Sequence, residues 1–230
     1  MEIVVRPALP EDSVTLVELM LQAAGDTLQF ILDDLEPRVS AGEVFKHMIS
    51  SIDSECSYRH CWVAVVQSGA HAPVVGMMNA FPASLLSDQT TPSNLSSREV
   101  HLWPRTALQD WGSYCLNSLA VFPLYRRYGI ASRLIEQAID NAVSEGFGSV
   151  SLHVWADNAS AVRLYRGKGF HEIDRAAIPW HPRLPHSGGS LLMRLSGLSG
   201  RIGSSAPSHN VVLAASDGSD DRDVSRPSDR

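Results

Sequence analysis

The chain has 230 residues, 44% hydrophobic and 19% charged, which is the composition of an ordinary globular protein with one or two domains. Its formal charge of -6 gives no basic footprint for nucleic acid, and no run approaches the roughly 18 apolar residues of a membrane span. Three irregularly spaced cysteines are too few for a disulfide framework or a zinc site, so we expect no metal and a reducing, cytoplasmic location.

Strand and helix patterns alternate through the first third of the chain. The chain begins directly on a strand pattern, and no leader segment is expected before it. A Pro-Glu-Asp-Ser run then signals the start of a helix. In chain order we expect a strand at 3–6, a helix at 14–24, a helical region at 28–51 broken near Pro37, and a hairpin of strands at 61–66 and 74–80.

Two segments could shape a substrate site. Asp26, Asp33, Asp34 and Glu36 form an acidic cluster that would attract a cationic amine, although a solvated helix face is the interpretation we favour. Residues 84–112 are rich in Ser, Thr, Asn and Pro and are too long for a neutral connector. We interpret 84–112 as an insertion that covers part of an active site, with a variable surface loop as the alternative.

The segment 119–131, LAVFPLYRRYGIA, reads as a strand that runs into the start of a helix. Gly129 permits a tight turn, and the free N–H groups of a first helical turn favour an anion such as phosphate. Arg126 and Arg127 add positive charge. The segment matches neither the dinucleotide fingerprint nor the nucleotide P-loop, so a nucleotide-binding enzyme is disfavoured. The alternative interpretation, a basic surface turn that binds no ligand, is equally compatible with this segment alone.

A second strand–helix–strand unit follows the first. We expect a strand at 149–155, a helix that starts near 157–160 and ends at Gly167 and Gly169, a strand at 170–173 and a last strand at 190–195. From residue 197 the composition shifts to Gly, Ser, Asp and Arg. The sequence therefore predicts one α/β domain over 1–196 and a disordered tail over 197–230.

These two units together resemble the GNAT superfamily of acyl-CoA N-acyltransferases. The family's phosphate loop, [Q/R]-x-x-G-x-[G/A], matches Arg126, Gly129 and Ala131. Its second block matches Val154, Asn158, Ala161, Leu164, Tyr165, Gly169 and Phe170. The resemblance implies a central, mostly antiparallel mixed sheet of about seven strands, flanked by helices and splayed between the fourth and fifth strands. It also implies acetyl-CoA as the acyl donor.

The resemblance implies which residues bind the donor. The strand residues Leu119, Ala120 and Val121 would pair with the pantetheine arm, and a backbone N–H near Val121 would stabilise the oxyanion. Asn158 resembles the residue that contacts the same arm. The residues expected at the pyrophosphate are Arg126, Arg127, Tyr128, Gly129, Ile130, Ala131 and Ser132.

Two residues are candidates for proton transfer. Tyr165 matches the family position that protonates the leaving thiolate, with an amphipathic core tyrosine as the alternative. His153 is the candidate base, which would deprotonate the amine directly or through water, although a hydrogen-bonded structural histidine is the interpretation we favour. In ribosomal-protein N-terminal acetyltransferases a glutamate stands where this chain has His153, which argues against that peptide substrate.

Two functions remain after this reading. The first is an N-acetyltransferase that acts on a primary amine by direct attack, with a small molecule favoured over a peptide. The second is a non-catalytic module of the same fold that binds or senses acyl-CoA. The presence of both Tyr165 and His153 favours the enzyme. No nucleic-acid or membrane partner is expected, and a homodimer is left open.

Overall fold

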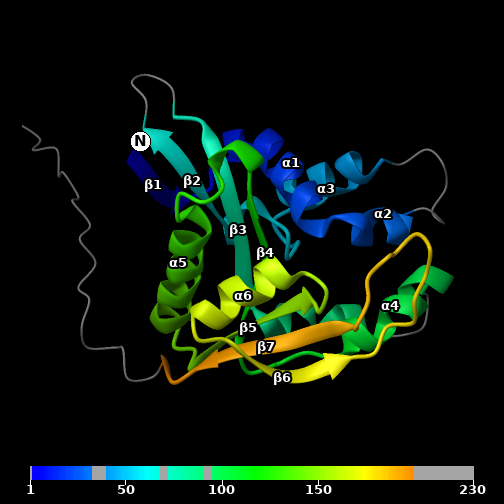
Figure 1. Cartoon of the computed structure of the whole chain (residues 1–230). Coiled ribbons are helices and arrows are strands. Elements are labelled where there is room, and N and C mark those ends of the chain that lie inside the picture. Colours follow the sequence, from blue (N-terminus) through cyan, green and yellow to red (C-terminus); the bar gives the residue numbers. More distant parts are fainter. Residues whose placement is uncertain (1, 33–39, 68–71, 91–94, 199–230) are drawn as a thin grey trace, which may run out of the picture.

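A seven-stranded mixed sheet forms the centre of the protein, as a computed structural model shows for residues 2–32, 40–67, 72–90 and 95–198 (Figure 1). The strand order is β1-β2-β3-β4-β5-β7-β6. The strands are β1 (Glu2–Pro7), β2 (Cys61–Gln67), β3 (Val74–Pro82), β4 (Tyr114–Val121), β5 (Ser149–Trp155), β6 (His171–Ala176) and β7 (Ser190–Ser196). Helices flank the sheet, so the expected fold class is confirmed.

Six α-helices are described. They are α1 (Ser13–Ala24), α2 (Asp26–Leu32), α3 (Ala41–Ser50), α4 (Ser97–Ala107), α5 (Ile130–Ser144) and α6 (Ala159–Gly167). The expected hairpin is also present, because β2 and β3 pair antiparallel. The break expected near Pro37, together with Asp33, Asp34 and Glu36 of the acidic cluster, lies outside the described residues.

The sheet opens between β4 and β5. These two strands are parallel and pair only at their beginnings, where Tyr114 faces Val150 and Cys115 faces Ser151. Beyond them, Asn117 is an extra residue that bulges from β4 opposite β3. The remaining residues of β4 pair with β3 alone. Their edge toward β5 therefore keeps backbone groups that a ligand can use.

Helices cover both faces of the sheet. On one face α1 and α3 pack through buried residues such as Leu16, Leu19 and Ile49. On the other face α5 packs through a stripe at helical spacing: Ile130, Leu134, Ile135, Ala138, Ile139 and Ala142. This stripe fixes α5 firmly against β3 and β4, so the start of α5 is held at the end of β4.

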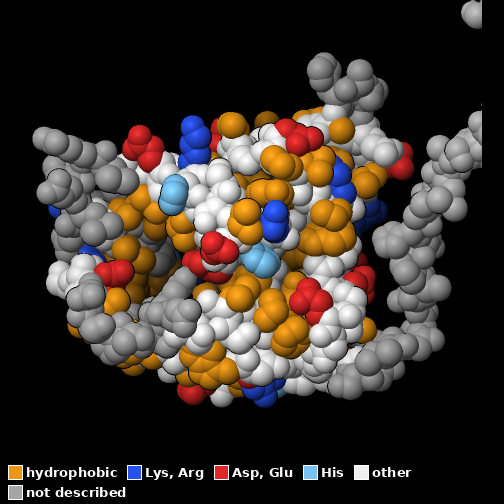
Figure 2. Space-filling view, turned by 180° about the vertical axis from the view of Figure 1, so that it is seen from behind, with side chains coloured by type: hydrophobic (Ala, Val, Ile, Leu, Met, Phe, Trp, Pro, Cys, Tyr) orange, Lys and Arg blue, Asp and Glu red, His pale blue; other side chains and the backbone are white. Residues whose placement is uncertain are grey.

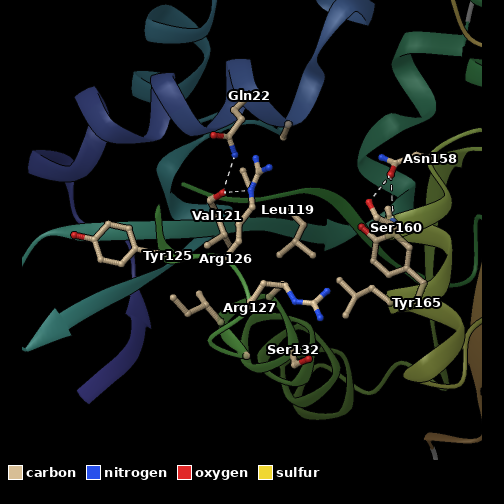
Figure 3. A pocket seen from close by; sticks show the side chains of 17 residues that line it. Gln22, Leu119, Val121, Tyr125, Arg126, Arg127, Ser132, Asn158, Ser160 and Tyr165 are labelled. Atoms are coloured by element: carbon tan, nitrogen blue, oxygen red, sulfur yellow. Dashed lines mark hydrogen bonds between the residues drawn. The ribbon is translucent and has the colours of Figure 1, made fainter. Parts of the chain in front are cut away.

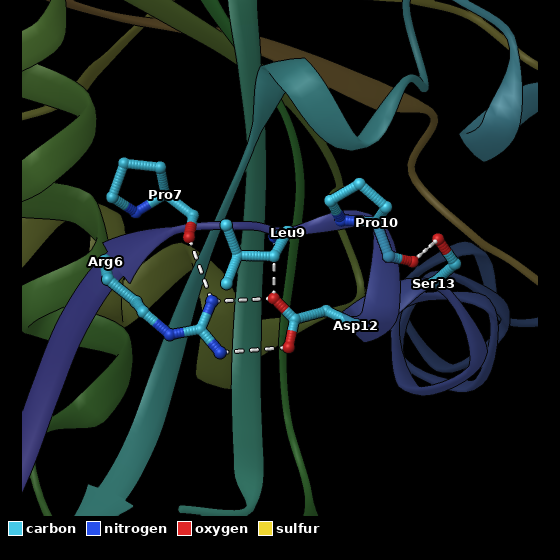
Figure 4. A network of polar contacts seen from close by, with 6 residues as sticks. All are labelled: Arg6, Pro7, Leu9, Pro10, Asp12 and Ser13. Atoms are coloured by element: carbon cyan, nitrogen blue, oxygen red, sulfur yellow. Dashed lines mark hydrogen bonds and ion pairs between the residues drawn. The ribbon is translucent and has the colours of Figure 1, made fainter.

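The connection between β1 and α1 is fixed by a forked ion pair (Figure 4). The Arg6 guanidinium donates to both oxygens of Asp12, at 2.7 and 3.0 Å, and the Leu9 N–H donates to the same carboxylate at 2.8 Å. Burial alone would raise the pKa of Asp12, but the hydrogen bonds from Arg6 and Leu9 outweigh it and lower the pKa. The network sets the direction in which α1 leaves the sheet.

The described parts of the segment 84–112, which are 84–90 and 95–112, contain helical structure. They contain part of the 3₁₀ segment η3 (Ala83–Thr90) and the whole of α4, whose first turn is capped by Ser96 and Glu99. Helix α4 contacts two distant segments: Arg98 donates to the Phe30 carbonyl at 3.1 Å, and a ring nitrogen of His101 lies 3.0 Å from the Pro179 carbonyl oxygen.

The folded chain continues past β7. Leu198 is 1% exposed, and its N–H donates to the Gly148 carbonyl at 3.1 Å. The rest of the predicted tail, 199–230, lies outside the described residues. The domain therefore includes Leu198, two residues beyond the expected boundary.

Candidate active site

A cavity of about 660 Å³ lies where β4 and β5 diverge (Figure 3). It is bordered by the end of β4, the loop to α5, the first turn of α5, one face of α6 and part of α1. The lining residues expected from the sequence are Leu119, Ala120, Val121, Arg126, Arg127, Gly129, Ile130, Ala131, Ser132, Asn158 and Tyr165. Residues from distant parts of the chain, from Gln22 to Tyr165, thus meet around one space.

The loop before α5 has the geometry of an anion site. Arg127 and Gly129 have positive φ angles of 70° and 77°, which turn successive N–H groups toward one concavity. Gly129 is the residue before α5, so the unpaired N–H groups of the first turn face the same region. The side chains of Arg126 and Arg127 are exposed beside it. Polar backbone and positive charge therefore converge at this end of the cavity.

The end of β4 is held by two side chains from different segments. Gln22 on α1 and Arg126 both donate to the Val121 carbonyl, at 3.0 and 3.1 Å (Figure 3). Arg126 thus fixes the turn in addition to supplying charge. No local signal could reveal Gln22, because it lies 99 residues from Val121 and stands on an ordinary amphipathic helix.

The opposite wall belongs to α6. The Asn158 side-chain oxygen caps this helix by accepting from the Ala161 N–H at 3.2 Å. Tyr165 is half-buried at the cavity wall, and its ring packs edge-on against Phe170. Burial raises the pKa of Tyr165 to about 12, so the hydroxyl is protonated at neutral pH and is available as a proton donor.

One expected donor-binding residue does not line the cavity, and several lining residues were not expected. The Tyr128 side chain is 64% exposed and lies outside the lining. The additional lining residues are Gln22, Ala23, Tyr125, Ser160, Ala161 and Leu164. Ala161 and Leu164 belong to the motif around Tyr165, so their helical spacing from Asn158 could have indicated them.

His153 lies at a different, smaller cavity of about 100 Å³. This second cavity is lined by Leu86, Arg105, Thr106, Gln109, Cys115, Leu116, Asn117 and His153. A ring nitrogen of His153, Nε2, lies 2.6 Å from the Leu108 carbonyl oxygen and therefore donates to it, while Nδ1 lies 3.4 Å from the Ser190 hydroxyl. Burial, and then the charge of Arg105, lowers the pKa of His153 to about 3.

The thiol of Cys115 at the same cavity is unsuited to covalent chemistry. Burial raises its pKa to about 12, which keeps it protonated at neutral pH. All three cysteines are free and buried. Among the described residues no three His, Cys, Asp or Glu side chains gather into a metal site. The same residues contain no helix long and apolar enough to cross a membrane.

A sheet opened between parallel central strands, with a phosphate-type loop at the opening, is the architecture of the acyl-CoA N-acyltransferase class. The chain belongs to the acetyltransferase (GNAT) family, whose sequence model matches residues 28–170.

Characterised relatives match a shorter part of the chain. The ribosomal protein bS18-alanine N-acetyltransferase of Escherichia coli (strain K12) is 40% identical over 57 residues, which are 25% of this chain and 38% of that protein. N-alpha-acetyltransferase 30 of Saccharomyces cerevisiae is 38% identical over 60 residues, 26% of this chain and 34% of that protein. The chain thus spans less than two-fifths of these curated relatives.

The fold is shared over a longer stretch. An N-acetyltransferase from Staphylococcus aureus Mu50 superposes with a TM-score of 0.62 and 18% identity, covering 84% of this chain and 100% of its own. At that identity the likeness shows the fold alone.

Proposed function

We propose that this protein transfers an acetyl group from acetyl-CoA to the primary amine of a small molecule. The observation that carries the proposal is the single cavity that joins the phosphate-type loop, the free edge of β4 and the protonated Tyr165. Each of these parts meets one need of acyl transfer from a thioester: donor binding, orientation of the carbonyl, and protonation of the leaving sulfur.

The donor would lie along β4. The N–H groups from Arg127 to Ser132, with the Ser132 hydroxyl, would hold the pyrophosphate at the start of α5. The backbone edge at 119–121, apart from the Val121 carbonyl that accepts from Gln22 and Arg126, would pair with the pantetheine amides, and its N–H groups would stabilise the oxyanion. Asn158 uses its side-chain oxygen as a helix cap, which leaves its amide N–H groups to donate to the same arm.

In the chemical step the neutral amine attacks the thioester carbonyl. The new C–N bond forms, the C–S bond breaks, and Tyr165 gives its proton to the departing sulfur and recovers one from solvent. The amine proton leaves to solvent or to His153. The low pKa of His153 makes its imidazole a weak base, so we favour water as the acceptor, and the role of His153 as base stays a hypothesis.

Contacts over the end of β5 support a small acceptor rather than a peptide. The Trp155 indole donates to the Thr27 hydroxyl at 3.1 Å, which ties β5 to α2. Phe30 of α2 packs edge-on against His181, with ring centroids 4.8 Å apart. Together with the contact between α4 and Pro179, these contacts join α2, α4 and the β6–β7 connection into one layer beside the end of β5. We propose that this layer covers the acceptor side of the site, which would suit a small molecule, since a peptide needs an open groove.

The decisive experiment is a thiol-release assay over a panel of small amines and N-terminal peptides, with acetyl-CoA binding measured in parallel. The proposal predicts amine-dependent release of CoA with at least one small amine. Tight acetyl-CoA binding without turnover on any amine would instead support the non-catalytic sensing module. A cytoplasmic location, a homodimer and the absence of a nucleic-acid partner stay predictions.

A further inference from the structure

Arg105 on α4 carries a partly buried charge that the described part of the chain does not neutralise. Its Nε atom is buried without a hydrogen-bond partner, and the guanidinium makes no ion pair among the described residues. The nearest carboxylate in sequence, Asp110, is held by Arg194 through both oxygens. Against the Trp155 ring the guanidinium carbon lies 5.9 Å from the centroid, a weak contact.

A cation that is partly withdrawn from water without a partner is unfavourable, and arginine does not relieve this by losing its proton. Burial lowers the pKa of Arg105 from its ordinary value, yet a guanidinium stays charged at neutral pH. Isolated buried charges are rare because desolvation is not repaid without a partner. A ligand that supplies the missing negative charge would remove the penalty.

The charge faces the second cavity, whose other polar lining is neutral. Thr106, Gln109 and Asn117 offer hydroxyl and amide groups, and His153 is uncharged because of its low pKa. At about 100 Å³ the cavity exceeds the roughly 30 Å³ that one water molecule occupies, so it has room for a carboxylate group. Guanidinium binds a carboxylate through two parallel hydrogen bonds.

The two cavities border neighbouring residues of one strand. The second cavity touches β4 at Cys115, Leu116 and Asn117, and the donor cavity touches it from Leu119 onward. Asn117 and Leu119 are two residues apart, which corresponds to about 7 Å along a strand. A small molecule whose amine and carboxylate are separated by a similar distance would place the carboxylate at Arg105 and the amine at the donor cavity.

We propose that Arg105 binds a carboxylate of the acceptor, so that the substrate is a small amine that also carries a carboxylate, such as an amino acid whose amine and carboxylate are several bonds apart. This inference rests on the proposed function, since it assigns the acceptor of the same reaction.

Binding of reaction products tests the inference apart from turnover. N-acetylamino acids and the corresponding N-acetylamino acid amides are titrated calorimetrically into the CoA-loaded protein, because each pair differs only in the carboxylate. We expect at least one acid to bind about 10- to 100-fold more tightly than its amide, the range for a hydrogen-bonded charge. Arg105→Met should abolish that preference, and Arg105→Lys should restore part of it.

Two binding results would overturn the inference: acids that bind no better than their amides, or an acid preference that survives in Arg105→Met. The comparison within the unaltered protein stands even where a variant fails to fold. The parallel thiol-release panel separates this failure from that of the proposed function. Turnover of neutral amines alone would leave the acetyltransferase standing and contradict the carboxylate site.

Discussion

The two residues predicted to transfer protons lie at different cavities, and burial shifts their pKa values in opposite directions. Tyr165 lines the large cavity with a pKa raised to about 12, so it is an acid that never ionises near neutral pH. His153 lies at the smaller cavity with its pKa lowered to about 3, so it is a neutral hydrogen-bonding group there. The sequence marks both as titratable but does not reveal their burial, which depends on α4 and α6.

Replacing the Tyr165 hydroxyl should affect turnover far more than donor binding. Tyr165→Phe keeps the ring against Phe170 and removes the proton donor, so we expect kcat to fall about 100-fold, within the range for general acid catalysis. Steady-state thiol release and acetyl-CoA titration check this, with Tyr58→Phe on the remote segment η2 (Tyr58–His60) as control. An unchanged kcat in Tyr165→Phe would remove the tyrosine from the chemistry.

The buried His153 should make stability fall in acid. The unfolded chain protonates this imidazole near pH 6.5, whereas the folded chain does so only near pH 3. Unfolding therefore takes up a proton between these values, and His153 should contribute a loss of at most about 1.4 kcal/mol per pH unit as pH falls from 6.5.

Urea unfolding at pH 7 and pH 5 measures this effect. His153→Gln should reduce the difference in unfolding free energy between the two pH values, whereas replacing the exposed His171 by Gln should not. Equal pH dependence in the wild type and His153→Gln would show that His153 is not buried in its neutral form.

At the scale of the elements, the ends of strands and helices carry the site, and side chains from other elements hold them there. The Val121 carbonyl at the end of β4 accepts from α1 and from the following loop. The start of α1 depends in turn on the pair of Arg6 and Asp12. Gln22 on α1 therefore connects the stability of the turn before α1 with the shape of the donor cavity.

Breaking the Arg6–Asp12 pair should destabilise the protein at neutral pH. Asp12→Asn removes the charge and one good acceptor, and we expect a loss of about 1–3 kcal/mol, the range for hydrogen bonds to charged groups. Because the folded pKa of Asp12 is lowered, its contribution is present above the unfolded pKa of about 3.9 and is lost as pH falls further.

Denaturant melts of Asp12→Asn at pH 7 and pH 3 test that sign. The gap between variant and wild type should narrow at the lower pH, and Glu11→Gln, an exposed neighbour, should show little effect at either. A constant gap would mean that the carboxylate charge does not matter.

At the scale of the whole molecule, two separate cavities border the same strand, β4, where the sheet opens. The donor cavity lies against α5 and α6, and the second cavity lies under α4. Figure 2 shows the reverse face, which is hollowed on the side that carries α2 and α4. This arrangement agrees with a donor and an acceptor that reach β4 from different directions.

Local motifs indicated most of the donor half and little of the acceptor half. The phosphate loop and the Asn158–Tyr165 helix are continuous in sequence, so spacing alone brought Arg126, Gly129 and Tyr165 to attention. The sequence does not indicate a role for Arg105 or Gln22, because the position of each depends on packing against a strand that is distant in the chain. The composition of the segment 84–112 predicts an insertion near the active site but not its structure, in which the Ser96–Glu99 cap starts the helix α4 that borders the second cavity.

The most direct test of the account is acetyl-CoA affinity after a change in the loop before α5. Arg126→Ala combined with Gly129→Asp removes a cation, places a carboxylate at the anion site and strains a residue with a φ of 77°. Gly146→Asp is the matched control, because Gly146 has a φ of 84°, follows the other end of α5 and does not line the donor cavity.

Calorimetric titration should show affinity lowered about 100-fold or more in the double variant, the loss expected from several charge-assisted contacts, and wild-type affinity in the control. Normal acetyl-CoA binding by the double variant would contradict the account.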